Sequence, residues 1–99
     1  MTTSSFYDVL VIGAGLAGMR AAIAAHEQGA SVALLTKVHP VRSHSNAAQG
    51  GINAALTDRG DHWEDHAFET VKGSDYLCDQ DAVEVLAQEA GRDIIALEH

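Results

Sequence analysis

Residues 8–36 have the sequence DVLVIGAGLAGMRAAIAAHEQGASVALLT, which carries the strongest fold signal in the chain. The apolar, β-branched run at 8–12 predicts a strand covered on both faces, as in a parallel sheet. Residues 16–28 are alanine-rich with helical spacing of the larger apolar side chains, and Gly29 is a natural helix stop. Residues 31–36 predict a second buried strand. Strand, helix and strand in this order predict a right-handed βαβ unit, and hence the α/β class.

The composition bounds the classes of function. The chain has 99 residues, of which 46% are hydrophobic and 20% charged, as in one ordinary small globular domain. Fourteen acidic and six basic residues give a net charge of -8, which argues against nucleic acid as a partner. The single cysteine, Cys78, favours a reducing compartment. No secretory signal and no membrane-spanning stretch is visible, so the residues predict a cytosolic segment.

Beyond the βαβ unit the pattern predicts one loop and two helices. Residues 37–52 lack a sustained period and predict an extended loop, whereas 61–71 predict a helix that the KGSD sequence at 72–75 breaks. A last helix is expected from position 79 or 81, with Gly91 as a point of interruption. Because residues 79–99 stop without a clear cap, we expect the chain to end inside a larger domain.

Three glycines mark a candidate phosphate site between the first strand and the helix. Gly13 permits the tight turn, Gly15 lets the backbone approach a pyrophosphate, and Gly18 allows the helix to pack closely on the strand. The helix N-terminus adds free N–H groups and a positive dipole. The sequence therefore predicts a dinucleotide contact over Gly13, Ala14, Gly15, Leu16, Ala17 and Gly18.

The end of the second strand departs from the NAD-binding pattern. An Asp or Glu that binds a ribose hydroxyl is expected there, but the chain has Thr36 and Lys37. Thr36 could bond a ribose or phosphate, and Lys37 could neutralise one. These residues alone predict nucleotide binding and leave the nucleotide open.

A histidine loop follows, with the sequence RSHSNAAQGG at 42–51. Three stretches together, DVLVIGAGLAGMRAA, LLTKVHPVRSHSNAAQGGINAAL and ETVKGSDYLCDQDAVE, resemble the N-terminal part of the succinate dehydrogenase or fumarate reductase flavoprotein subunit. The R-S-H-[ST]-x-x-A-[QE]-G-G element is the most specific part. The resemblance implies that residues 1–99 are the N-terminal portion of a Rossmann-like FAD-binding domain, with its remainder and a substrate-capping domain absent.

By the same resemblance, His44 carries FAD covalently, through its ring nitrogen and the flavin 8α-methyl. A free histidine titrates near ~6.5, so a neutral nucleophile is available at cytosolic pH. Gly50 and Gly51 are expected to let the backbone approach the flavin ring. The family commonly has Ser-Lys where Thr36 and Lys37 stand. Further residues that the resemblance places on the cofactor surface are Ser43, Ser45, Ala48 and Gln49.

The implied activity is interconversion of succinate and fumarate by hydride transfer with the flavin. Implied partners are a dicarboxylate substrate, an iron–sulfur subunit and membrane-anchor subunits of cytochrome b type, and the implied place is the cytoplasmic side of the cell membrane, peripheral through those subunits. The family's substrate and proton-transfer residues lie later in the chain, so no catalytic acid or base is assigned. The direction of the reaction stays open.

Several alternatives remain on sequence grounds. L-aspartate oxidase shares similar segments with noncovalent FAD, but it lacks the histidine that corresponds to His44. A noncatalytic nucleotide-binding fragment is supported by the length alone. His62 and His66 stand at i, i+4, but without the H-E-x-x-H pattern a solvated acidic helix is favoured over a metal site. Cys78 is expected to be a small core residue.

Overall fold

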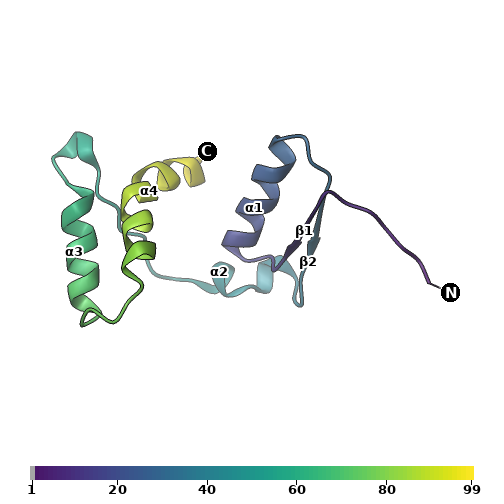
Figure 1. Ribbon diagram of the computed structural model, residues 1–99, viewed down its shortest axis with the longest axis horizontal. Coiled ribbons are helices and arrows are strands. Elements are labelled where there is room, and N and C mark those ends of the chain that lie inside the picture. Colours follow the sequence, from purple (N-terminus) through teal and green to yellow (C-terminus); the bar gives the residue numbers. More distant parts are fainter. Residues whose placement is uncertain (1) are drawn as a thin grey trace. The chain divides into compact units, whose positions relative to one another are not determined.

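The computed structural model describes residues 2–99. The chain divides into two units, with the boundary after Gln49. The first unit contains the expected βαβ arrangement and the second contains two long helices (Figure 1). The elements of the first unit are β1 (Val9–Ile12), α1 (Leu16–Glu27), β2 (Val32–Leu35), the 3-10 turn η1 (Pro40–Arg42) and α2 (His44–Ala47). Those of the second are the 3-10 turn η2 (Thr57–Arg59), α3 (Trp63–Gly73) and α4 (Gln80–Glu98). The predicted α/β class is confirmed.

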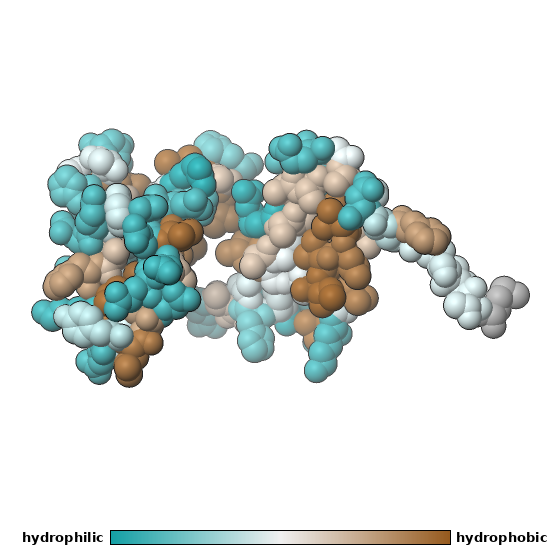
Figure 2. Space-filling model, in the orientation of Figure 1, coloured by the Kyte–Doolittle hydropathy of each residue, from teal (hydrophilic) through white to brown (hydrophobic). Residues whose placement is uncertain are grey.

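The two strands pair in parallel, with Val9 opposite Val32 and Ile12 opposite Leu35. Helix α1 lies on one face of this sheet, where Ala22 and Ile23 border a groove together with Val32. The opposite face is bare and forms the brown patch over β1 and β2 in Figure 2. On it Leu10 is 59% exposed, Ile12 77% and Leu35 58%. The prediction of strands covered on both faces is therefore wrong for residues 2–99, because no described residue supplies a second layer.

Helix α1 ends just before Gly29, as the sequence predicted. Gly29 has φ +88, and the N–H groups of Gly29 and Ala30 donate to the carbonyls of His26 and Ala25 at 2.9 and 3.2 Å. This left-handed residue after the helix satisfies carbonyls that have no partner inside it. The predicted apolar face is only partly covered, since Met19 is half-buried while Ile23 is 48% exposed.

A reciprocal pair of hydrogen bonds joins the beginnings of the two strands. The Asp8 N–H donates to Ser31 Oγ, and the Ser31 N–H donates to Asp8 Oδ2, both at 2.9 Å. The backbone N–H of Ser31, aided by its side chain, holds the pKa of Asp8 below its ordinary value of 3.8. A carboxylate whose pKa is depressed by folding stabilises the fold most above its unfolded pKa.

We expect Asp8→Asn to lower stability at neutral pH and to remove one source of pH dependence. The contribution of Asp8 should be complete above about pH 5 and lost as the pH falls through the folded-state pKa, which lies under 3.8. Urea denaturation at several pH values measures it, and the gap between wild type and variant should close toward about pH 2. Glu98→Gln, at the exposed end of α4, is the control. An equal gap at all pH values would contradict the expectation.

The second unit is built around helices α3 and α4, which pack on each other (Figure 1). Its buried residues are Ala87 and Ala90 on α4, and Trp63 and Val71 of α3 are half-buried. Helix α4 runs through Gly91 without a break. A Cβ at that position would lie 3.3 Å from the Ala55 carbonyl oxygen, so the glycine allows the preceding segment to approach the helix. The predicted interruption at Gly91 is therefore wrong.

The turn between α3 and α4 begins two residues later than predicted. Lys72 and Gly73 still belong to α3, and the helix ends where Asp75 and Tyr76 adopt left-handed φ values of 53 and 62. None of the helices in residues 2–99 combines the length and apolarity that a membrane crossing needs.

Candidate functional site

The glycine turn has the conformation that its sequence predicted. Gly13 has φ +109, and its N–H donates to the Leu35 carbonyl at 2.7 Å, which fixes the turn to the end of β2. A Cβ on Gly18 would overlap the carbonyl oxygen of Gly13 and lie 2.8 Å from its carbonyl carbon. Both positions therefore require glycine for reasons within the chain itself. Ala14, between them, is buried with 3% exposure.

Several backbone N–H groups of this glycine turn have no hydrogen-bond acceptor among residues 2–99. Among residues 2–99, the hydrogen bonds give no acceptor to the N–H groups of Ala14, Gly15, Ala17 and Gly18. The first turn of α1 contains no acidic side chain. Free amides at the positive end of a helix, with glycine at positions 15 and 18, fit an anion such as the diphosphate of a dinucleotide. The residues present therefore fit the predicted cofactor contact.

The two residues after β2 lie next to this turn in the βαβ unit. Thr36 is half-buried, and its hydroxyl donates to the Val38 carbonyl at 2.6 Å, while Lys37 is exposed. The Thr36 oxygen keeps lone pairs that can accept from a ribose hydroxyl. Contact of either residue with a nucleotide stays a prediction.

The histidine loop is more ordered than predicted. Residues 37–52 were expected to be extended, but they contain η1 and the single-turn helix α2, which begins at His44. Ser43 caps this helix, because its Oγ accepts the Asn46 N–H at 3.2 Å, and Ser43 is 8% exposed. The Asn46 side-chain amide donates to the Val41 carbonyl at 2.7 Å and closes the loop from the other side.

A second serine joins this loop to the glycine turn. Ser45 Oγ accepts the N–H of Leu16, the first residue of α1, at 2.9 Å. The contact explains part of the need for Gly15, since a Cβ there would lie 3.2 Å from the same oxygen. His44, with an exposed side chain, is therefore adjacent to a residue bound at the helix N-terminus.

Asn46 was missed from the sequence. Serine is one of the residues preferred at helix N-caps, so Ser43 was the signal that could have identified α2. The remaining predicted residues, Ala48, Gln49, Gly50 and Gly51, are exposed. Gly50 and Gly51 belong to the second unit, and an added Cβ on either would meet nothing within 4 Å. The expectation that these two glycines let the backbone approach a flavin ring closely stays a prediction.

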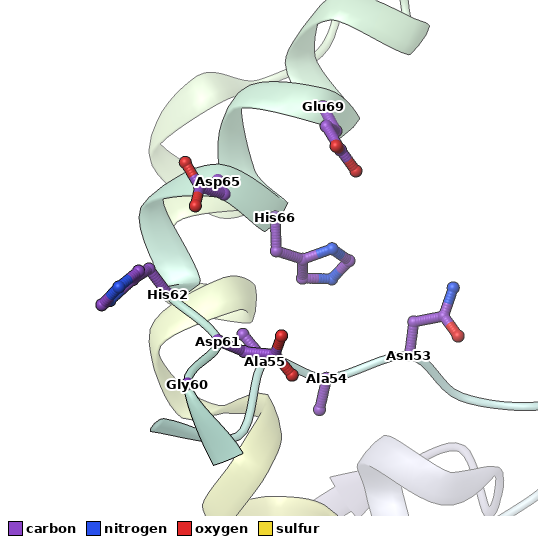
Figure 3. Close-up of a pocket in the computed structure, with 9 residues that line it drawn as sticks. All are labelled: Asn53, Ala54, Ala55, Gly60, Asp61, His62, Asp65, His66 and Glu69. Atoms are coloured by element: carbon purple, nitrogen blue, oxygen red, sulfur yellow. The ribbon is translucent and has the colours of Figure 1, made fainter. Parts of the chain in front are cut away.

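The second unit has a polar pocket of about 340 Å³ beside the start of α3. His66 and Glu69 point toward the side where Asn53 lies, whereas His62 points away from them (Figure 3). Within residues 2–99, no three His, Cys, Asp or Glu side chains converge as metal ligands.

The parallel βαβ unit, with a glycine turn presenting free amides, defines a dinucleotide-binding protein. Over residues 8–99 the chain matches the family described as FAD binding domain. The chain therefore belongs to the FAD-binding domain family, and the predicted Rossmann-like fold is confirmed.

Two known proteins and one solved structure are similar to this chain. The chain is 52% identical to the succinate dehydrogenase flavoprotein subunit of Rickettsia bellii over 94 residues, which are 94% of this chain and 16% of that protein. It is 48% identical to a fumarate reductase flavoprotein subunit of Mycobacterium tuberculosis over 95 residues, again 94% of this chain and 16% of the relative. A solved structure, Mycobacterium smegmatis Sdh1 in complex with UQ1, matches with 41% identity and a TM-score of 0.84, covering 93% of this chain and 16% of that one. The resemblance predicted from the motifs is confirmed, over about a sixth of the relatives' length.

Proposed function

We propose that these residues belong to the flavoprotein subunit of a succinate dehydrogenase or fumarate reductase, with FAD bound covalently to His44. One observation carries this proposal: the glycine turn and the R-S-H-S loop lie in one unit and are joined by the bond from Leu16 to Ser45. A diphosphate on the turn would then have the histidine loop beside it. The identity with relatives of both names supports the substrate class, a four-carbon dicarboxylate.

Different residues of the first unit hold different parts of the cofactor in this proposal. The free amides of Ala14, Gly15, Ala17 and Gly18 bind the diphosphate, because those of Gly13 and Leu16 already donate within the chain. Thr36 and Lys37 serve the ribose and phosphate side. Ser43, Ala48 and Gln49 complete the surface of this unit toward the flavin. When bound, the flavin accepts a hydride from a substrate carbon and releases the electrons one at a time.

His44 is the nucleophile that forms the covalent bond. Its ring nitrogen would supply the nucleophile for a bond to the 8α-methyl carbon of the flavin. Exposure of the His44 side chain leaves its ring accessible for this bond. His44 also distinguishes the proposed enzyme from an L-aspartate oxidase-like enzyme, in which FAD is not covalently held.

Further parts of the proposal rest on the family resemblance alone. We propose that residues 1–99 form the N-terminal portion of the FAD-binding domain, because they span 16% of the Rickettsia bellii subunit. The assembly then includes an iron–sulfur subunit and cytochrome b-type membrane anchors, which hold the flavoprotein peripherally on the cytoplasmic side of the cell membrane. The acidic balance of the chain does not favour a direct contact with anionic lipid.

The proposal is tested on the product of the complete open reading frame. We expect acid-precipitated, washed protein to retain flavin fluorescence in stoichiometric amount, since the bond to His44 survives denaturation. The purified protein should also oxidise succinate or reduce fumarate with an artificial electron acceptor or donor. Flavin that washes entirely into the supernatant would reject the covalent bond and favour the noncovalent alternative. A protein without flavin would reject both.

A further inference from the structure

Helix α2 cannot fix the position of His44 by itself. It has four residues, His44–Ala47, and a single helical turn is unfavourable in isolation because nucleation orders several residues for one hydrogen bond. The position of the imidazole therefore depends on the bonds that hold this turn in place.

Most hydrogen bonds of this loop join residues within it, and one joins it to helix α1. Ser43 and Asn46 bond within the loop, to each other and to Val41, so they shape it without attaching it to the rest of the unit. Of the hydrogen bonds that residues 39–48 make in the described chain, the one between Ser45 Oγ and the Leu16 N–H reaches a distant element, 29 residues away. Ser45 thus joins the loop to the N-terminus of α1.

Packing adds little at this junction. A cavity of about 270 Å³ lies between Leu16 and Met19 of α1 and the loop residues Pro40 and Val41. Val41 is 61% exposed and Leu16 41%. Side chains that leave a cavity between them lose part of their mutual contact, so they restrain the loop weakly. The hydrogen bond at the rim of this cavity is accordingly the main restraint.

We infer that Ser45 is a positioning residue for covalent flavin attachment, holding the His44 turn against the phosphate-binding end of α1. The inference rests on the proposed function and deepens it. It assigns Ser45 a role through the Leu16 amide, in place of the cofactor-lining role that the family resemblance implied. Binding of FAD and its attachment should therefore respond differently to loss of this hydroxyl.

The test uses the apo form of the complete open reading frame product, with FAD added at time zero. A neutral hydrogen bond contributes on the order of 1 kcal/mol, so Ser45→Ala should slow covalent incorporation about fivefold, followed by in-gel flavin fluorescence. Ser45→Thr, which keeps the hydroxyl, should stay within about twofold of wild type. Noncovalent affinity, measured in a His44→Ala background, should change by less than about twofold on adding Ser45→Ala.

A matched control is available at the other end of the strands. Ser31→Ala also removes a serine oxygen that accepts a distant backbone N–H, that of Asp8, but it lies away from the loop. It should leave the attachment rate unchanged. Independently of flavin, hydrogen exchange at the Leu16 amide should accelerate about fivefold in apo Ser45→Ala and not in Ser31→Ala.

The outcomes separate the two proposals. Wild-type protein that attaches no FAD overturns the proposed function and this role with it. Wild-type attachment with an equal rate in Ser45→Ala overturns only the role of Ser45. A loss of noncovalent affinity as large as the loss of rate would make Ser45 a direct cofactor ligand and overturn the positioning role. A slowing of equal size in Ser31→Ala would do the same, because the effect would then be one of general stability.

Discussion

His44→Ala should abolish covalent flavin completely, while the protein still folds and binds FAD reversibly. Alanine has no nucleophile, and the side chain it replaces is exposed, so its loss removes little packing. The diphosphate contacts that we propose along the glycine turn use backbone amides and do not involve residue 44. Denaturing electrophoresis followed by in-gel fluorescence measures the covalent fraction, and gel filtration with absorbance near the flavin bands measures the total.

The control for this variant is His39→Ala. His39 lies in the same loop, where its Nδ1 accepts the Val41 N–H at 3.4 Å, but it has no place in the proposed site. It should retain the fluorescent band at wild-type strength. A band that survives in His44→Ala would place the covalent bond on another residue and reject the central part of the proposed function.

Gly18→Ala should damage the fold and the cofactor site together. The added methyl would overlap the Gly13 carbonyl, which belongs to backbone held by the bond from the Gly13 N–H to Leu35. Relief requires α1 to move away from the turn, which we expect to lower the free energy of unfolding by about 3 kcal/mol. The amides that face the diphosphate move with the helix, so purified protein should contain little FAD. Urea denaturation and flavin content per polypeptide measure the two effects.

Gly73→Ala is the matched control for that substitution. Gly73 is the last residue of α3, and a Cβ there meets nothing within 4 Å. Alanine also favours a helix, so stability should stay within about 1 kcal/mol of wild type and FAD content should not change. A Gly18→Ala protein as stable and as yellow as this control would show that the close packing of α1 on the turn is not required.

The parts of the fold that were predicted correctly depend on local sterics. Gly13, Gly18 and Gly29 occupy positions where a side chain would strain or collide with nearby backbone, so their spacing alone indicates the turn and the helix end. Helix α3 was likewise visible from the period of Trp63, Ala67 and Val71, because one face of it packs on α4.

The parts that were missed depend on contacts between distant segments. The bond between Ser45 and Leu16 spans 29 residues and leaves no periodic pattern, so residues 37–52 resembled an extended loop. Gly91 stays helical because Ala55 approaches it from outside the helix. The apolar composition of β1 indicated two covering layers, but coverage is a property of the surroundings, and Leu10 and Ile12 remain exposed.

The attachment of the Gly13 amide to Leu35 has a consequence for protein turnover. Because the Gly13 amide is bonded to the end of β2, we expect a nucleotide to bind the folded chain and not the unfolded one. A ligand present at a hundredfold excess over its dissociation constant shifts such an equilibrium by about 2.7 kcal/mol. A cell short of the vitamin from which FAD is made would accordingly lose this polypeptide to proteases, even with its messenger RNA at normal abundance.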